Sequence, residues 1–508
     1  MNQPETASVI SSSAEVSSAE YFAQRQLKQG TVGWLLLIGL GVAYVISGDF
    51  AGWNFGIAQG GWGGMFIATA LAALMYLCLC LSMSEMSTMM PTAGGGYSFA
   101  RAAFGPFGGY LTGTAILIEY AIAPAAIAVF IGGYCESLFG INGWMIYLAC
   151  YAIFMGIHLK GAGEALKIMF AITLVAAVAL VVFIGAMIPH FNAQNLFDIP
   201  VSTGVGASLF LPHGYLGIWA AVPFAIWFFL AVEGVPLAAE EAKDPAKSLP
   251  RGLIGAMLIL TAFAMLILFL GAGAAGASTL QNSGAPLVDA LVKVYGTNTW
   301  LATFVNFVGL AGLIASFFSI IYAYSRQIFA LSRAGYLPTS LSLTNKNKAP
   351  YLAIIIPGII GFLLSLTKEG DSLILIAVFG ATISYVLILL SHIKLRLSKP
   401  DMPRPYKTPG GVITSSIALV SHIKLRLSKP DMPRPYKTPG GVITSSIALV
   451  LAVAAVIAGF VVNPKVWFIA AGIYVVFIAY FLFYSRYHLV KGTPEEEFAN
   501  IKAAEQEL

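Results

Sequence analysis

Long apolar stretches recur along the whole chain, separated by short polar or glycine-rich segments. Each stretch is close to or above the length of about 20 residues that an α-helix needs to cross a bilayer. The pattern predicts twelve membrane-spanning helices, at residues 33–58, 62–82, 106–133, 142–158, 167–189, 215–242, 251–276, 300–331, 350–366, 372–392, 441–462 and 465–486. Several exceed the minimum length, which indicates tilt or a break within the span.

Composition agrees with this pattern, because 58% of the 508 residues are hydrophobic and only 10% are charged. Soluble proteins carry charges on about a quarter of their residues. We therefore predict an all-α, polytopic membrane protein. The polar segment 1–29 lacks the features of a cleaved signal peptide, so we expect the first span to serve as the insertion signal.

The distribution of basic residues predicts the orientation. An even number of spans puts both termini on the same side of the membrane. If that side is the cytoplasm, only three of the 28 lysines and arginines lie outside, namely Lys293, Lys368 and Lys465. The positive-inside rule requires such an asymmetry. We expect residues 1–29 and 487–508 to be cytoplasmic tails, and the net charge of +5 to face anionic headgroups rather than nucleic acid.

One segment occurs twice without any change. SHIKLRLSKPDMPRPYKTPGGVITSSIALV fills residues 391–420 and recurs at 421–450. Diverged repeats indicate architecture, whereas 30 identical residues in tandem are typical of a recent duplication or an assembly error. The apolar piece at 411–420 is too short to cross a bilayer. We expect the surplus copy to enlarge a cytoplasmic loop, residues 393–440, and to leave the topology unchanged.

Two spans carry helix-breaking residues beside a carboxylate. The first contains Ser47-Gly48-Asp49 near its middle, and the sixth contains Glu233-Gly234-Val235-Pro236. Glycine loosens the backbone and proline removes a hydrogen-bond donor. Irregular backbone at membrane depth is tolerated only where it is buried in protein or lines a cavity, and secondary transporters place their sites at such breaks. If 33–189 and 215–392 are two halves, each half begins with a broken helix.

Several segments resemble the amino acid–polyamine–organocation superfamily of permeases. The loop SEMSTMMPTAGGGYSFARAAFGPFGGYLTG after span two is similar to that family's E…P-x-x-G-G-x-Y…G pattern, and AAEEAKDPAKSLPRG at 238–252 matches its A-E-E-x-x-x-P…P-R signature. YSRQIFALSRAGYLP at 324–338 resembles the segment after span eight, although Ala334 replaces the usual acid. The resemblance implies a leucine-transporter-like fold of two inverted five-helix repeats, spans one to five and six to ten, plus two further helices at 441–486.

The first break departs from the usual pattern of that superfamily, which reads G-S-G-I and binds a substrate carboxylate through its free amides. Here Ile46-Ser47-Gly48-Asp49 places an aspartate where the isoleucine would be. A carboxylate there repels a substrate carboxylate and attracts an ammonium group. Glu119 in span three and Glu233 add two acids, and no span carries Lys or Arg at mid-membrane. Ionisable residues at that depth indicate a functional pathway, so the pattern favours a cation, a proton, or both.

We expect the substrate site to consist of Ser47, Gly48, Asp49, Phe50, Tyr120, Phe228, Val232, Glu233 and Gly234, with Glu119 and Glu233 as candidate proton carriers. Tyr120 rests on the family analogy, and the two phenylalanines on contact of their faces with an ammonium group. Other roles stay open. Asp49 could cap the second half of span one, Glu233 could serve helix bonding alone, Glu119 could stay protonated against a neighbouring helix, and the aromatics could be plain packing.

The predicted function is a permease for ethanolamine or a similar small amine, because the stretch SGDFAGWN also resembles the first break of bacterial ethanolamine permeases. The resemblance implies alternating access in a bacterial inner membrane, with the lipid bilayer and a coupled proton or other ion as partners. An amino acid or polyamine permease is the alternative, and a membrane sensor that binds without transport is another. We find no nucleophile–base pair or metal-ligand spacing, so we expect no enzyme, cofactor or metal site.

Overall fold

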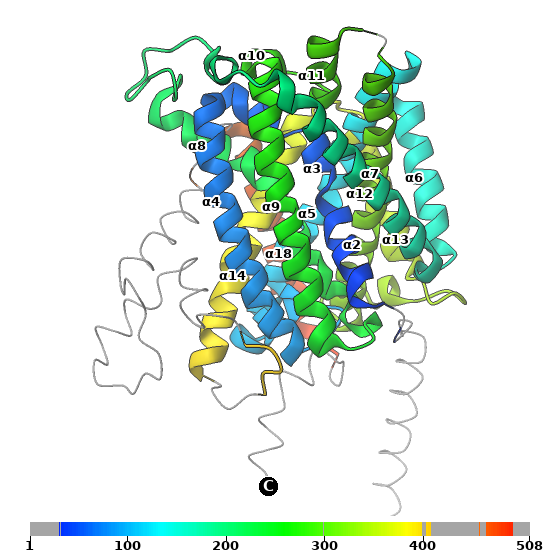
Figure 1. Ribbon diagram of the computed structural model, residues 1–508. Coiled ribbons are helices and arrows are strands. Elements are labelled where there is room, and N and C mark those ends of the chain that lie inside the picture. The colour runs from blue at the N-terminus through cyan, green and yellow to red at the C-terminus, as the bar shows by residue number, and fades with distance from the viewer. Residues whose placement is uncertain are drawn as a thin grey trace, which may run out of the picture.

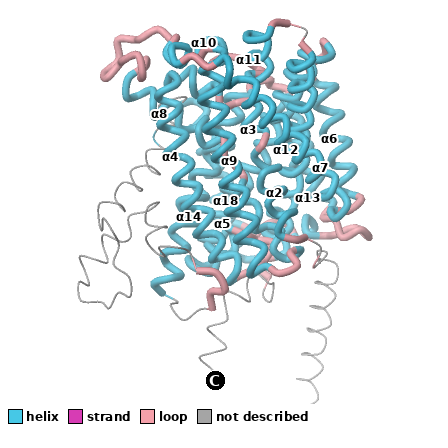
Figure 2. Tube along the Cα trace, viewed as in Figure 1, coloured by secondary structure: helices cyan, strands magenta, loops and turns pink. Residues whose placement is uncertain are grey.

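The computed structural model describes residues 30, 32–297, 299–398, 403–407, 457 and 464–490. Figures 1 and 2 show that these residues form a bundle of long helices joined by short loops. Extended pairing within the described residues is limited to two isolated bridges, Val32 with Ala242 and Thr344 with Pro350. The predicted all-α class is therefore confirmed for the described part of the chain.

The first half begins with a broken helix. It consists of α2 (Trp34–Val45), α3 (Ser47–Phe50), α4 (Asn54–Met89), α5 (Gly96–Phe139), α6 (Trp144–Leu159) and α7 (Ala162–Met187). The helix α4 contains the end of the first predicted span and the whole second span, because the chain turns at Gly61, whose φ of 68° is readily adopted only by glycine. The helix α5 begins ten residues before the predicted start of span three, at residue 106, and turns at Gly105.

The second half has the same kind of start. After the short 3₁₀ helices η1 (Ile188–His190) and η2 (Ala193–Phe197) come α8 (Gly214–Trp227), the 3₁₀ helix η3 (Val232–Glu241), α9 (Pro245–Ala275), α10 (Ala277–Leu280), α11 (Pro286–Tyr295), α12 (Trp300–Arg333), η4 (Thr339–Ser342), α13 (Tyr351–Ser365) and α14 (Gly370–Ser398). The chain ends its described part with α18 (Pro464–Phe483) and η5 (Ser485–Tyr487). The helix α14 continues beyond the predicted span end at residue 392, since the next proline that could stop it is Pro400.

Eight helices of the described chain are long and apolar enough to cross a membrane, and α2, α6 and α13 are shorter apolar helices that account for predicted spans one, four and nine. Large apolar side chains such as Leu148, Val178 and Val476 are exposed on the outer helices, as expected of surfaces that face lipid. The chain is thus a multi-pass membrane protein. The predicted span 441–462 lies outside the described residues apart from Ile457, as do the tail at 1–29 and most of the enlarged loop, so the count of twelve and the inverted repeats stay predictions.

The two broken helices lie inside the bundle. The helix α14 packs along α5, α4 packs along α8 and α9, and α12 packs against both α5 and α7. The segments α3 and η3 are enclosed by these helices, and every residue from Leu40 to Asn54 is buried. In Figure 1, α10 and α11 lie at the opposite end of the bundle from the start of α2. Irregular backbone therefore occurs where protein, rather than lipid, surrounds it.

Candidate functional site

The first break lies after Asp49 rather than at it. Ile46 keeps right-handed helical dihedrals between α2 and α3, so the helical run continues to Phe50. The backbone then becomes extended at Ala51 and takes a φ of 96° at Gly52, before α4 begins at Asn54. The residue preceding α4 is Trp53, and no side chain caps that helix. Asp49 therefore lies in the last turn before the break, and the reading of Asp49 as the cap of the second half is wrong.

The second break lies before Glu233. The helix α8 ends at Trp227, Ala231 has a left-handed φ of 77°, and η3 starts at Val232. Sequence inspection predicted the interruption at Glu233-Gly234-Val235-Pro236, but these residues form the first turns of η3. Pro236 removes one helical hydrogen bond and disturbs the turn before it, so the chain is interrupted upstream of the proline.

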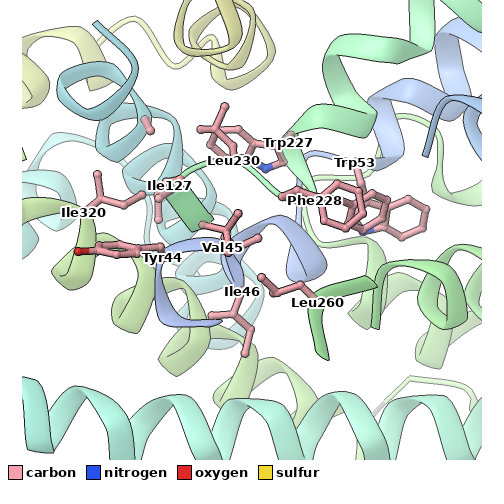
Figure 3. Packing of buried hydrophobic residues seen from close by; sticks show 14 of the residues in the cluster. Tyr44, Val45, Ile46, Trp53, Ile127, Trp227, Phe228, Leu230, Leu260 and Ile320 are labelled. Atoms are coloured by element: carbon pink, nitrogen blue, oxygen red, sulfur yellow. The ribbon is translucent and has the colours of Figure 1, made fainter. Parts of the chain in front are cut away.

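The two breaks touch each other. A Cβ atom on Gly48 would lie 2.6 Å from the backbone oxygen of Trp227 and 3.3 Å from the Cα atom of Phe228. The Trp227 indole donates a hydrogen bond of 3.0 Å to the backbone oxygen of Ala51. The rings of Trp53 and Phe228 stack at 5.6 Å between centroids, and Figure 3 shows them side by side. The structure thus brings the predicted site residues Gly48 and Phe228 into direct contact.

The carboxyl group of Asp49 has no hydrogen-bond partner in the part of the chain that the structure describes. Its side chain is fully buried, and neither oxygen has a hydrogen-bond partner among the described residues. The short helix α3 packs against α12 and α9, and α9 contributes fully buried apolar residues such as Leu260, which Figure 3 labels. A charged carboxylate is costly to bury unless another group pairs with it. This position is therefore suited to a cation or a proton.

Ser47 and Phe50 face α12, which the sequence analysis did not include in the site. The Ser47 hydroxyl lies 2.8 Å from the Ser316 hydroxyl, which in turn donates to the backbone oxygen of Tyr44 at 2.7 Å. The Phe50 ring fills the space over Gly309 and Gly312, where added Cβ atoms would approach it to 3.0 and 2.6 Å. The spacing of small residues at 309, 312 and 316 on one face of a helix is the signal that could have identified this wall.

Glu119, Tyr120 and Glu233 form a second cluster, separate from Asp49. Glu119 and Glu233 are both buried, and each carboxyl group accepts a hydrogen bond from a tyrosine hydroxyl. The Tyr120 hydroxyl donates to Oε1 of Glu233 at 3.1 Å, and the Tyr385 hydroxyl donates to Oε1 of Glu119 at 3.4 Å. No described contact joins either glutamate to Asp49. We define Glu119 and Glu233 as the carboxyl pair.

Residues around the carboxyl pair come from four helices. Tyr385 lies on α14 and Tyr76 on α4, and their hydroxyls are 2.8 Å apart. A Cβ atom on Gly234 would lie 3.1 Å from the Tyr120 hydroxyl, and its neighbour Val232 is fully buried. Tyr120, Val232 and Gly234 were predicted from the sequence, whereas Tyr76 and Tyr385 were not, since nothing local distinguishes these two tyrosines from packed aromatics.

The site is closed in this structure. The gap between the two breaks leaves no room for a water molecule, and it is lined by Tyr44, Val45, Ser47, Trp227, Leu230 and Ile320. Neither Asp49 nor the carboxyl pair lines it. Entry of a solute therefore requires movement of the broken helices, which is the kind of rearrangement that transporters with discontinuous helices undergo.

Ion pairs hold the end of η3. Arg326 of α12 contacts Glu241 at 2.7 Å, and Arg333 contacts Glu240 at 2.6 Å. The backbone amide of Ala93, just before α5, also donates to Glu240 at 2.9 Å. These charged contacts lie in the AAEEAKDP and YSRQIFALSR segments, and they join η3, α12 and the start of α5.

Comparison with known proteins identifies the type of protein. Residues 33–483 match the family model described as amino acid permease. The chain is 28% identical to an uncharacterized transporter of Rhizobium meliloti, with 71% of this chain and 78% of the relative covered. It is 27% identical to the branched-chain amino acid permease BcaP of Bacillus subtilis (74% and 82% covered) and 25% identical to the aromatic amino acid transport protein AroP of Escherichia coli (74% and 84% covered).

Proposed function

Because the chain belongs to the amino acid permease family, whose named relatives are transporters rather than enzymes, we propose that it carries a small organic amine without a carboxyl group. Ethanolamine is the candidate substrate. Membership of the family already makes the chain a membrane transporter, so the first part of the proposal concerns the substrate.

The observation that carries the proposal is the unpaired carboxyl group of Asp49. It is buried beside the first break and has no hydrogen-bond partner among the described residues. An ammonium group would supply the missing partner through a charge-assisted hydrogen bond. A substrate carboxylate would instead bring a second negative charge into the same low-dielectric region, where repulsion is strong.

The backbone around Asp49 also favours a positively charged ligand. The helical run through α2, Ile46 and α3 ends at Phe50, so Asp49 lies at a carboxyl end, where the helix dipole attracts cations. Backbone oxygens of the break are already engaged, since Tyr134 donates to the oxygen of Phe50 at 2.9 Å and Trp227 donates to that of Ala51. The Asp49 carboxylate is therefore the natural acceptor for an incoming ammonium group.

The relatives provide the second candidate. BcaP and AroP carry names that refer to branched-chain and aromatic amino acids, which have both an amino group and a carboxylate. If this chain carried such substrates, the Asp49 carboxyl group would have to be protonated during binding or lie beside the amino group.

Uptake of labelled ethanolamine into proteoliposomes tests the proposal. Losing a charge-assisted hydrogen bond costs about 1.5–3 kcal/mol, so we expect Asp49→Asn to weaken ethanolamine affinity by roughly tenfold to a hundredfold. The matched control is Asp371→Asn, which removes one exposed carboxylate at the start of α14 and should leave affinity unchanged. Competition by leucine equal to that by unlabelled ethanolamine would refute the substrate assignment.

The proposal also includes the finer topology. We place both termini in the bacterial cytoplasm, with alternating access produced by two inverted halves, 33–189 and 215–392. The support is the distribution of lysine and arginine and the matching position of the two broken helices. Labelling of single cysteines introduced at residues 20 and 500 with a membrane-impermeant reagent tests it, because both positions should be protected in intact cells.

A further inference from the structure

A groove of about 610 Å³ opens on the bundle between α2, α9 and residues 403–407 of the loop after α14. The two helices begin side by side, because Val32, just before α2, pairs with Ala242, just before α9. From α9, one helix face lines the groove, and the lining is completed by Trp34 and Ile38 of α2 and by Pro405 and Tyr406 of the loop. The groove is separate from the two breaks, none of whose residues lines it.

The face of α9 in the groove changes from basic to apolar along the helix. Its larger side chains lie four, three and four residues apart, on one side of the helix, and they are Lys247, Arg251, Ile254 and Leu258. At 1.5 Å per residue, Leu258 lies about 10 Å farther along the axis than Arg251. The groove therefore has two cations near the start of the helix and an apolar continuation toward the middle of the bundle.

The floor of the groove is the line along which the two helices touch. A Cβ atom on Gly255 would lie 2.8 Å from Cδ1 of Ile38, and one on Gly252 would lie 2.5 Å from Cβ of Leu37. Because glycine lets α9 approach α2 so closely, no side chain of these two residues fills the groove. Trp34 is 42% exposed and Leu258 57% exposed, so both walls present apolar surface.

The third wall is held in place by contacts with α4. Arg404 lies 3.1 Å from the buried Glu85, and the amide of Tyr406 donates to the hydroxyl of Thr88 at 3.3 Å. Pro405, between these two anchored residues, lines the groove together with Tyr406. The loop therefore shapes the groove as a fixed part of the packed protein.

The two cations of the groove are available to an external anion. Lys247 is 72% exposed and contacts Asp244 at 3.3 Å, a surface pair of the kind that contributes little. Arg251 is exposed and has no ion pair with a described residue. No acidic residue is among those that line the groove in the described part of the chain. The groove thus offers positive charge without a competing carboxylate in its walls.

We propose that this groove binds one anionic phospholipid, with the phosphate between Lys247 and Arg251 and an acyl chain along Trp34, Ile254 and Leu258. Basic pockets between membrane helices bind anionic headgroups, and tryptophan is favoured at the level of the headgroups. A free phosphate would use the cations but leave the apolar part of the groove empty. The placement of this lipid in the cytoplasmic leaflet rests on the proposed orientation, whereas its binding depends on neither the orientation nor the substrate.

The lipid would connect elements that carry the transport site. The helix α2 leads into the first break, and α9 follows η3, which begins at the second break. The helix α2 also packs against η3. A phospholipid that contacts α2, α9 and the loop should therefore stabilise the arrangement of both broken helices, and its binding should raise the unfolding temperature of the protein.

Native mass spectrometry of the delipidated full chain measures the binding. The probes are phosphatidylglycerol, which is anionic, and phosphatidylcholine with the same acyl chains, which has no net charge. Each basic residue near an anionic headgroup contributes roughly a fivefold factor in affinity. We expect the first phosphatidylglycerol to bind roughly 25-fold more tightly than phosphatidylcholine, and Lys247→Gln/Arg251→Gln to abolish that difference.

Two double variants serve as controls. Lys247→Arg/Arg251→Lys keeps both charges and should keep the preference for phosphatidylglycerol. Lys160→Gln/Lys346→Gln removes two exposed lysines that do not line the groove and should bind as the wild type does. Thermal unfolding gives the second readout, because phosphatidylglycerol should raise the unfolding temperature of the wild type but not that of Lys247→Gln/Arg251→Gln. Equal unfolding temperatures of these two proteins in phosphatidylcholine would confirm that the variant is folded.

Three results would overturn the lipid site. The first is equal affinity of the wild type for the two lipids, and the second is an unchanged preference in Lys247→Gln/Arg251→Gln. The third is competition by glycerol phosphate at the same concentration as phosphatidylglycerol, which would show that the groove takes a free phosphate. None of these measurements involves transport, so they stand apart from the uptake experiments that test ethanolamine as the substrate.

Discussion

At Gly48 the first broken helix meets the backbone of the second. A Cβ atom added there would lie 2.6 Å from the carbonyl oxygen of Trp227. Real Cβ atoms essentially never approach another atom so closely, and backbone cannot move aside as a flexible side chain can. Glycine at this position is therefore required by the distance between two chain segments and not by a special backbone dihedral.

The first residue-scale prediction follows from that contact. Gly48→Ala should push the two breaks apart, with a loss of about 1–3 kcal/mol in the free energy of unfolding, typical of overpacking, and a strong loss of transport. The control is Gly185→Ala in α7, where an added Cβ atom meets nothing within 4 Å. Thermal unfolding in detergent and uptake at equal protein content measure both effects. Full activity of Gly48→Ala would mean that the breaks lie farther apart in the working protein.

Single residues differed in how well the sequence identified them. Asp49, Glu119 and Glu233 could be predicted as site residues from the sequence. Carboxylates are rare within apolar spans, and those that occur there indicate a functional site. Tyr76 and Tyr385 could not be named, although they complete the cluster around the carboxyl pair, because they lie 309 residues apart in the chain. A pairing between distant helices depends on the packing of the whole bundle, and no local pattern contains it.

At the scale of elements, the sequence identified which helices break but not where. Glycine and proline mark weak points near residues 48 and 234, whereas the irregular backbone occurs at Ala51–Gly52 and before Val232. Ala231, which adopts the left-handed conformation, carries no sequence signal for it, because alanine is otherwise the strongest helix former. Contacts across the bundle, such as the hydrogen bond from Trp227 to Ala51, decide which peptide leaves the helix.

The ion pair between η3 and α12 leads to an element-scale prediction. Arg326 and Glu241 are both buried, with 2.7 Å between their charged groups, and the Arg326 guanidinium also lies 4.0 Å from the centre of the Tyr322 ring. Removing one partner of a buried pair leaves the other charge uncompensated and costs about 3–5 kcal/mol. We therefore expect Glu241→Gln to lower the free energy of unfolding of this closed state by that amount.

The measurement is thermal unfolding of the purified protein, together with the rate at which a thiol reagent labels Cys80, which is fully buried on α4. The Glu241→Gln variant should unfold at lower temperature and label faster. Asp244→Asn is the matched control, because its partner Lys247 is 72% exposed and such surface pairs contribute about 0–1 kcal/mol. Equal effects of the two substitutions would show that η3 is not held by the buried pair.

For the whole molecule, hydrophobic pattern alone predicted the membrane class and most helix positions, since spanning a bilayer requires both length and apolar composition. It also predicted the buried placement of both breaks, because lipid cannot satisfy irregular backbone. The loop after α14 was harder to predict. Arg404 of this loop lies 3.1 Å from the buried Glu85 of α4, which His392 of α14 also approaches to 3.3 Å, so part of the loop belongs to the packed protein.

The duplicated segment provides a test at this scale. Deleting 391–420 or 421–450 yields the same chain, since the copies are identical, and that chain retains one set of the residues that contact α4. The described copy supplies His392 and Arg404 to Glu85, and the amide of Tyr406 to Thr88 at 3.3 Å. We expect the shortened chain to transport at the wild-type rate per molecule, as measured by uptake normalised to protein. Within it, Arg404→Ala should lower the unfolding temperature, because the Glu85 carboxylate would remain buried with one partner fewer. A shortened chain that is expressed and inserted but inactive would show that both copies contribute to the working fold.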